Sequence, residues 1–383
     1  MSAQRTRDEA IDALRGAVMV LMALDHTRDF WGDGRRDPTN LITTSVALFA
    51  TRWVTHYCAP VFVLLAGVSA WISAEGRSPA TATRALVTRG LWLVALELTV
   101  VRFGWLFNLD YRFTFVQVIW AIGWSMVCLA GLARLGTQGA ALVGAAMVLG
   151  HNLFDGLHAE RFGALAWLWR VLHDGGRLEP VTGHRVFVAY PLVPWIGVMA
   201  LGYALGPWMR FDVARRRRAL LRTGAALTVA FVLLRAANVY GDPSPWASQP
   251  RAGFTLLSFV RCTKYPPSLD YLLMTLGPSL MVWGALTGRA LGRWRAVVTF
   301  GRVPLFFYLA HLPLLHAMAG LWLYAHGGWA AIEAAQRSDA GTGGSLPLVY
   351  AAWAAGLALL WPLCRWFEGV KARHRGAWWT AYV

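Results

Sequence analysis

The sequence predicts an all-α, polytopic integral membrane protein: a helical bundle of about ten transmembrane helices, with both termini in the cytoplasm. Of its 383 residues, 57% are hydrophobic and only 15% are charged, whereas about 25% of the residues of a soluble domain are charged. Several windows, such as 53–74 and 303–332, contain no Asp, Glu, Lys or Arg. Each is close to or above the roughly 20 residues that a helix needs to cross the hydrocarbon layer.

Ten spans follow one another along the chain. They cover residues 11–31, 53–74, 86–106, 113–133, 137–154, 187–209, 219–239, 265–287, 297–324 and 346–367. Residues 41–50 are expected to form a short interfacial or re-entrant helix, and the longest outside loops are expected at 155–186, 240–263 and 325–345. Because no loop is large enough for a second folded domain, residues 1–383 are expected to form one transmembrane domain. In the third span, Glu97 and Arg102 are candidates for an ion pair.

The basic residues set the orientation. With the N-terminus inside, the segments that face the cytoplasm hold 20 basic and 6 acidic residues, and the rest of the chain is nearly neutral. This asymmetry follows the positive-inside rule and places both termini in the cytoplasm. It also explains the net charge of +16 without a nucleic-acid partner, although an anionic cytosolic ligand would suit the same face.

The first span carries an unusual polar stripe. At 100° per residue one face presents, at spacings of 3, 4, 3, 4 and 3, the residues Asp12, Arg15, Met19, Met22, His26 and Asp29. Arg15 and His26 are eleven residues apart, or roughly 16 Å along the helix axis. Asp25 and Asp29 lie close enough in sequence to orient the imidazole. The alternative is structural: Arg15 reaches to lipid phosphates, and His26 makes a helix–helix hydrogen bond.

Further histidines are expected in the outer half of the bundle. His56 lies near the outer end of the second span, and His311 and His316 lie in the outer half of the ninth. Pro304 and Pro313 are expected to interrupt the backbone hydrogen bonds around His311. No His-x-x-x-His spacing favours a metal site, and the four cysteines lack the spacing of metal ligands.

Four stretches resemble a known family. They read IDALRGAVMVLMALDHTRDF, VTHYCAPVFVLLAGVSAWIS, KYPPSLDYLLMTLGP and FGRVPLFFYLAHLPLLH. They look like bacterial relatives of the heparan-α-glucosaminide N-acetyltransferase catalytic domain, over nearly the whole chain. The pair Arg15–x10–His26 also resembles the Arg/Lys–x10–His signature of transmembrane acyltransferase family three. The chain differs from the lysosomal pattern, which has Asn in place of His26 and a histidine about three turns further on.

The resemblance implies an acyl-CoA donor, acetyl-CoA above all, bound from the cytosol. The acyl group would pass across the lipid bilayer to an amine or hydroxyl of a glycan or amino sugar outside; the acceptor of the lysosomal enzymes is the amino group of a terminal glucosamine. The phosphates of CoA need cations, and Arg15, Arg89 and Arg302 are the candidates. No metal cofactor is implied, and a homodimer is possible.

The imidazole of His26 is the first candidate for the catalytic base. It would take a proton from the acceptor during its attack on the thioester, with Asp25 or Asp29 as its orienting carboxylate. His311 and His56 are the reserve candidates. An acyl-imidazole intermediate is the alternative to direct transfer.

Two other classes of function compete with an acyltransferase. A proton-coupled secondary transporter could use His26, Glu97 and Asp270 as relay groups. Against it, the sequence shows no repeated halves with matching broken helices. A non-catalytic receptor or scaffold would leave the group of outer imidazoles without a role.

Overall fold

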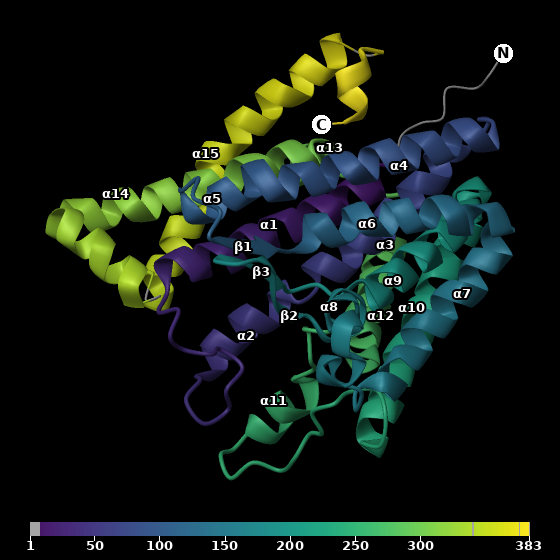
Figure 1. Cartoon of the computed structure of the whole chain (residues 1–383). Helices are drawn as coiled ribbons and strands as arrows, with labels where there is room; N and C mark the ends of the chain where they lie inside the picture. The colour runs from purple at the N-terminus through teal and green to yellow at the C-terminus, as the bar shows by residue number, and fades with distance from the viewer. Residues whose placement is uncertain (1–7, 339–340, 375, 383) are drawn as a thin grey trace. The chain divides into compact units, whose positions relative to one another are not determined.

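The computed structural model describes residues 8–338, 341–374 and 376–382 of the chain. This part is mostly helical (Figure 1). It divides into two compact units, of which the first comprises residues 1–58, 212–225 and 278–383. The second comprises residues 59–211 and 226–277.

The first unit is built from seven α-helices or parts of them. They are α1 (Glu9–Trp31), α2 (Val46–Thr55), the first half of α10 (Val213–Ala237), the second half of α12 (Leu269–Leu286), α13 (Arg295–Arg302), α14 (Pro304–Ser338) and α15 (Leu346–Arg373). Two short 3₁₀ segments, η7 (Gly292–Trp294) and η8 (Trp378–Ala381), complete it. Helix α1 packs against α2, α13, α14 and α15, so most of its residues are buried on every side.

Both ends of α1 have defined hydrogen-bond partners. The Asp8 side chain caps the first turn by accepting from the Ala10 N–H at 3.0 Å, which satisfies a donor that the helix itself leaves unpaired. At the other end the Thr342 N–H donates to the Phe30 carbonyl at 3.1 Å. The Gly344 N–H donates to the Trp31 carbonyl at 3.0 Å. Residues 342–344, just before α15, therefore donate hydrogen bonds to the last carbonyl groups of α1.

Helices α1 and α13 touch backbone to backbone. A Cβ atom added to Gly16 would lie 1.8 Å from the Val297 carbonyl oxygen, and one added to Gly301 would lie 1.8 Å from the Asp12 carbonyl oxygen. Only glycine fits at these two positions, and small residues permit this close approach between helices in membrane proteins. The crossing fixes α13 beside the N-terminal half of α1.

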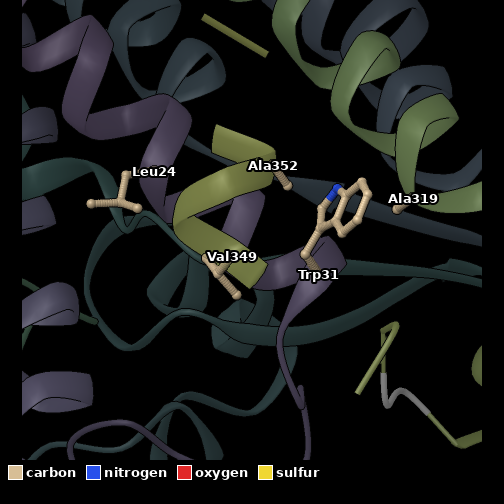
Figure 2. Packing of buried hydrophobic residues seen from close by; sticks show 5 residues of the cluster. All are labelled: Leu24, Trp31, Ala319, Val349 and Ala352. Atoms are coloured by element: carbon tan, nitrogen blue, oxygen red, sulfur yellow. The ribbon is translucent and has the colours of Figure 1, made fainter. Parts of the chain in front are cut away.

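A hydrophobic cluster holds the C-terminal half of α1 against α14 and α15. It consists of Leu24, Trp31, Ala319, Val349 and Ala352, all buried (Figure 2). The Trp31 side chain reaches between Ala319 and Ala352. Its indole N–H also donates to the Leu315 carbonyl at 3.4 Å, so the ring is fixed by a polar contact as well as by packing.

The predicted ninth span, 297–324, is wrong as a single helix. Helix α13 ends at Arg302, the backbone of Val303 leaves the helical region, and α14 begins at Pro304. Proline lacks the N–H that would continue the helix, so the interruption expected at this residue is confirmed. Pro313, by contrast, lies inside α14. The predicted loop 325–345 is also corrected, because α14 continues to Ser338 through a kink at Gly327 and Gly328.

The second unit contains the remaining helices and a small sheet. Its helices are α3 (Cys58–Ala74, from Ala59), α4 (Pro79–Leu96), α5 (Arg102–Leu106), α6 (Val118–Leu132), α7 (Gly136–Gly150), α8 (Ala166–Trp169), α9 (Leu192–Leu205) and α11 (Phe254–Val260), with the rest of α10 and α12. Shorter 3₁₀ and π segments join them: η1 (Glu97–Val101), η2 (Ala133–Leu135), η3 (His151–Phe154), η4 (Ala159–Leu165), η5 (Arg170–Asp174) and η6 (Gly206–Arg210).

Three short strands depart from the all-α prediction. They are β1 (Phe113–Val116), β2 (Gly176–Val181) and β3 (His184–Val188), in the order β1-β3-β2. Strand β1 runs parallel to β3, with Phe113 opposite Arg185, and β2 runs antiparallel to β3 with a register shift between Leu178 and Val181. The predicted fourth span therefore starts as a strand, and the predicted loop 155–186 is partly ordered by pairing with it.

The expected ion pair between Glu97 and Arg102 is wrong. Glu97, at the start of η1, accepts from the backbone N–H groups of Gln117 at 2.9 Å and Trp120 at 3.2 Å. It therefore caps α6, where unpaired N–H groups favour a carboxylate. Arg102 donates instead to the carbonyl of Asn108 at 2.7 Å and that of Phe113 at 3.1 Å.

In the described part of the chain, seven helical segments are long and apolar enough to cross a membrane. They are Val46–Ala74, Val118–Phe154, Leu192–Arg210, Val213–Ala237, Leu269–Leu286, Pro304–Ser338 and Leu346–Arg373. The segment Val118–Phe154 covers the predicted span 137–154 and the part of the predicted span 113–133 that follows β1. The predicted spans 11–31 and 86–106 are absent from the seven, since both carry several charged residues. These segments indicate a multi-pass membrane protein. The number of ten spans and the cytoplasmic location of both termini remain predictions.

Candidate functional site

Polar side chains gather at the C-terminal end of α1. We call this set the His26 cluster; it comprises Asp25, His26, Arg28 and Asp29 of α1, Arg52 and Thr55 of α2, and His311 of α14. All seven belong to the first unit. Helices α2 and α14 both pack against α1, which brings residues far apart in sequence to its last two turns.

Asp29 is the carboxylate next to the His26 imidazole. Its Oδ2 lies 3.4 Å from Nδ1 of His26, and the side chains are 36% and 10% exposed, respectively. A carboxylate can only accept a hydrogen bond, so Nδ1 carries the hydrogen in the neutral ring. The lone pair of that ring is then on Nε2, the nitrogen that can take up a proton.

Asp25 accepts hydrogen bonds from Arg52 and Thr55 of α2. Both of its carboxylate oxygens accept from Arg52 Nη1 at 2.7 Å, and Oδ1 also accepts from the Thr55 hydroxyl at 2.9 Å. Asp25 is 7% exposed, so these contacts supply the compensation that a buried charge requires. Of the two carboxylates proposed to orient His26, the geometry favours Asp29.

Arg28, Arg52 and Thr55 are the cluster members that sequence reasoning missed. Arg28 donates through Nη2 to Asp29 Oδ1 at 2.6 Å and lies with Nη1 2.9 Å from Asp25 Oδ1. The signal for Arg28 was its position three residues after Asp25, a spacing at which opposite charges meet on a helix. Arg52 offered no comparable signal, because its partner Asp25 lies 27 residues earlier in the chain.

The structure brings His311 to His26. Their ring centroids are 5.3 Å apart, with the planes tilted by 38°. His311 Nδ1 donates to the backbone carbonyls of Tyr308 at 2.7 Å and Phe307 at 3.1 Å. This fixes the tautomer and leaves the lone pair of the neutral ring on Nε2. His311 is fully buried, and its Nε2 has no hydrogen-bond partner among the described residues.

Two other histidines lie on the same helices. His56 is buried and follows α2 directly, so its backbone adjoins Thr55, whose hydroxyl binds Asp25. His316 stacks on Phe30 with ring centroids 4.7 Å apart. Just beyond α1, the hydrogen bond from Arg35 to Asp33, 2.8 Å long, lowers the pKa of the half-buried Asp33 carboxyl.

A second charged group lies at the N-terminal end of α1. We call it the Arg302 cluster; it comprises Glu9, Asp12 and Arg15 of α1, Thr299 and Arg302 of α13, and Glu368 of α15. Arg302 lies 2.8 Å from Glu368, 3.0 Å from Glu9 and 3.7 Å from Asp12. Arg15 donates to the Gly301 carbonyl at 3.3 Å and also lies 3.7 Å from Asp12.

The third candidate for CoA binding belongs to the other unit. Arg89 is half-buried on α4 of the second unit, so it is not part of the Arg302 cluster. No group of three or more His, Cys, Asp or Glu side chains that could hold a metal ion occurs within residues 8–338, 341–374 and 376–382. The four cysteines are free thiols.

Comparison with known proteins identifies the family. The family profile described as heparan-alpha-glucosaminide N-acetyltransferase, catalytic, matches residues 7–239, which is more than half of the chain. The match includes α1 and α2, and therefore His26, Asp29 and Arg52, but ends before α13 and α14. No individual curated protein matches the chain. The chain belongs to the heparan-α-glucosaminide N-acetyltransferase catalytic family.

Proposed function

We propose that this membrane protein transfers an acetyl group from acetyl-CoA, bound on the cytoplasmic side, to an acceptor on the opposite side. The acceptor is an amine or hydroxyl of a glycan or amino sugar, and the membrane is the inner membrane of a bacterium. Family membership makes the chain a transferase of the acetyltransferase type. The observation that carries the proposal is the His26–Asp29 contact on α1, within the matched residues.

The two residues have the roles of a base and its carboxylate partner. In the reaction the acceptor attacks the thioester carbonyl while His26 Nε2 takes its proton, and the same proton then goes to the departing thiolate of CoA. Asp29 stabilises the imidazolium through the Nδ1–H, a charge-assisted hydrogen bond that strengthens as the ring becomes positive. A positioned base of this kind typically contributes about 10²–10⁴-fold to the rate.

His311 and His56 remain reserve candidates for the base. His311 supports the proposal through its ring contact with His26, whereas His56 lies next to the residues that bind Asp25. Direct transfer leaves no acyl group on the protein, but a covalent route requires an acyl-imidazole. Acid quenching of a reaction with labelled acetyl-CoA distinguishes the routes, since only the covalent route yields a labelled protein.

The phosphates of CoA are proposed to meet Arg15, Arg89 or Arg302. Arginine suits this role because its planar guanidinium binds phosphate through two hydrogen bonds. Arg302 already faces three carboxylates, so a phosphate there would have to compete with them. Arg15 lies 3.7 Å from Asp12 and donates to the Gly301 carbonyl. No observation favours the transporter alternative.

Reconstitution tests the proposed function directly. The purified protein is placed in liposomes, with labelled acetyl-CoA on one side and glucosamine or a glucosamine-terminated oligosaccharide on the other. We expect labelled acetylated acceptor to accumulate on the acceptor side only, with one free CoA released for each acetyl group transferred. Empty liposomes are the control. Uptake of glucosamine without acetylation would instead identify a transporter and would refute the proposal.

A further inference from the structure

Arg28 carries hydrogen-bonding capacity that the described structure does not use. Its side chain is only 12% exposed, yet Nη1 has no hydrogen-bond partner among the described residues. Nη1 does lie 2.9 Å from Asp25 Oδ1, but its N–H bonds are not aligned with that oxygen. A buried donor without a hydrogen bond is costly, so a guanidinium nitrogen that has an ion pair but no hydrogen bond, close to a candidate base, requires a reason.

The need to hold Asp25 in place does not explain why Nη1 of Arg28 lacks a hydrogen bond. Arg52 already binds both oxygens of Asp25, and the Thr55 hydroxyl adds a third hydrogen bond. Asp25 is therefore neutralised by α2 without any hydrogen bond from Arg28. The side chains of Arg28 and Arg52 are almost equally exposed, at 12% and 13%. Of these two, only Arg28 also contacts Asp29.

The position of Arg28 relative to His26 is fixed by a shared carboxylate. Asp29 Oδ1 accepts from Arg28 Nη2 at 2.6 Å, and Asp29 Oδ2 lies 3.4 Å from His26 Nδ1. One carboxylate thus contacts a proton acceptor and a cationic donor that are two residues apart at the same helix end. Acyl transfer requires both groups: a base for the nucleophile and a donor for the negative charge that develops on the carbonyl oxygen.

We propose that Arg28 is a catalytic residue whose Nη1 N–H groups bind the oxyanion of the tetrahedral intermediate. This inference rests on the proposed function. The nucleophile forms a bond to the thioester carbon, the carbonyl π pair moves to oxygen, and His26 takes the proton of the nucleophile. The oxyanion bound by Arg28 then collapses, the C–S bond breaks, and the CoA thiolate receives that proton.

The experiment compares Arg28→Gln and Arg28→Lys with the matched control Arg52→Gln, all in the full-length protein. Three quantities are measured: turnover, the affinity for CoA, and the affinity for two analogues of acetyl-CoA. One analogue replaces the thioester by a methyl ketone. The other carries a trifluoromethyl ketone, which hydrates to a tetrahedral diol and therefore resembles the intermediate. The CoA affinity also shows whether each variant is folded.

We expect Arg28→Gln to lower turnover by about 10²–10³-fold, the loss typical of removing one oxyanion donor. Its preference for the trifluoromethyl over the methyl ketone should fall by a similar factor, with CoA affinity unchanged. Arg28→Lys should keep part of both effects, since it retains the charge but not the planar fork. Arg52→Gln should destabilise the protein and leave the analogue preference as in the wild type.

The inference is overturned if the Arg28 variants bind CoA and still prefer the trifluoromethyl ketone as strongly as the wild type does. It is also overturned if Arg52→Gln loses that preference to the same extent, because the effect would then come from the disturbed Asp25. Should Arg28→Gln fail to fold, the same measurements on Arg28→Lys decide. A wild-type protein that neither binds CoA nor transfers acetyl groups would instead refute the proposed function.

Discussion

The two ends of α1 carry similar residues in different roles. The Arg302 cluster contains only carboxylates, guanidiniums and one hydroxyl, whereas the His26 cluster adds two imidazoles to two carboxylates and two guanidiniums. Near neutral pH only imidazole readily takes up and releases a proton. Proton transfer is therefore proposed at the His26 end of the helix, and the Arg302 end carries fixed charges.

The contacts of the Arg302 cluster hold α1, α13 and α15 together, a role that we call a structural joint. Arg302 connects α13 to Glu9 of α1 and to Glu368 of α15. Arg15 connects α1 to the last turn of α13 through the Gly301 carbonyl. With three carboxylates against two guanidiniums, its formal charge is negative. This makes it a poor site for a phosphate unless a carboxylate moves away.

The largest effect is expected from His26→Ala, which removes the proposed base. Turnover should fall by about 10²–10⁴-fold, while the affinity for CoA stays close to that of the wild type. His316→Ala is the control, since its ring stacks on Phe30 rather than on His26. Steady-state assays and CoA titrations measure both quantities. Full activity in His26→Ala, with loss in His311→Phe, would transfer the role to α14.

Asp29→Asn tests which carboxylate serves His26. An amide cannot stabilise the imidazolium as a carboxylate does, so turnover should fall by about 10–100-fold, from the roughly 1.5–3 kcal/mol of a charged hydrogen bond. Asp25→Asn should chiefly lower the melting temperature, because Arg52 would lose its charged partner. Equal losses of turnover at equal stability in the two variants would contradict the preference for Asp29 over Asp25 as the partner of His26.

Gly301→Ala tests the joint between α1 and α13. The added Cβ would lie 1.8 Å from the Asp12 carbonyl oxygen, so the two helices must separate. We expect a loss of about 1–3 kcal/mol in the free energy of unfolding, as for other overpacked sites. The control is Gly320→Ala, where an added Cβ meets no atom within 4 Å. Thermal unfolding in detergent compares the two; equal melting temperatures would contradict the close crossing.

Arg302→Gln is expected to have the smallest effect. The side chain is 32% exposed, so solvent screening reduces the loss of stability to about 1 kcal/mol. Adding Glu368→Gln should restore part of it, because one unpaired carboxylate is removed. CoA affinity should change little if Arg302 is a structural joint. A large drop in CoA affinity without a drop in melting temperature would instead support phosphate binding at Arg302.

Local patterns in the sequence predicted several features correctly. The apolar composition predicted a multi-pass helical protein, and the Val303–Pro304 dipeptide marks the helix break that the structure shows. The small sheet was missed because β1 and β3 are separated by about 70 residues. Their pairing depends on contacts between distant segments, which no local periodicity records.

The local sequence is enough to place a cation near the start of α1 and an imidazole near its end. Helical periodicity is a local property, and it places Arg15 and His26 along one stripe whatever surrounds them. The partner that each charged group contacts depends instead on how the helices pack. Arg52 reaches Asp25 across 27 residues, and Arg302 reaches Glu9 across 293. Electrostatic and hydrogen-bonding energies depend on distances of a few ångströms in space. The packing of α2, α13, α14 and α15 around α1 therefore separated the joint from the candidate site.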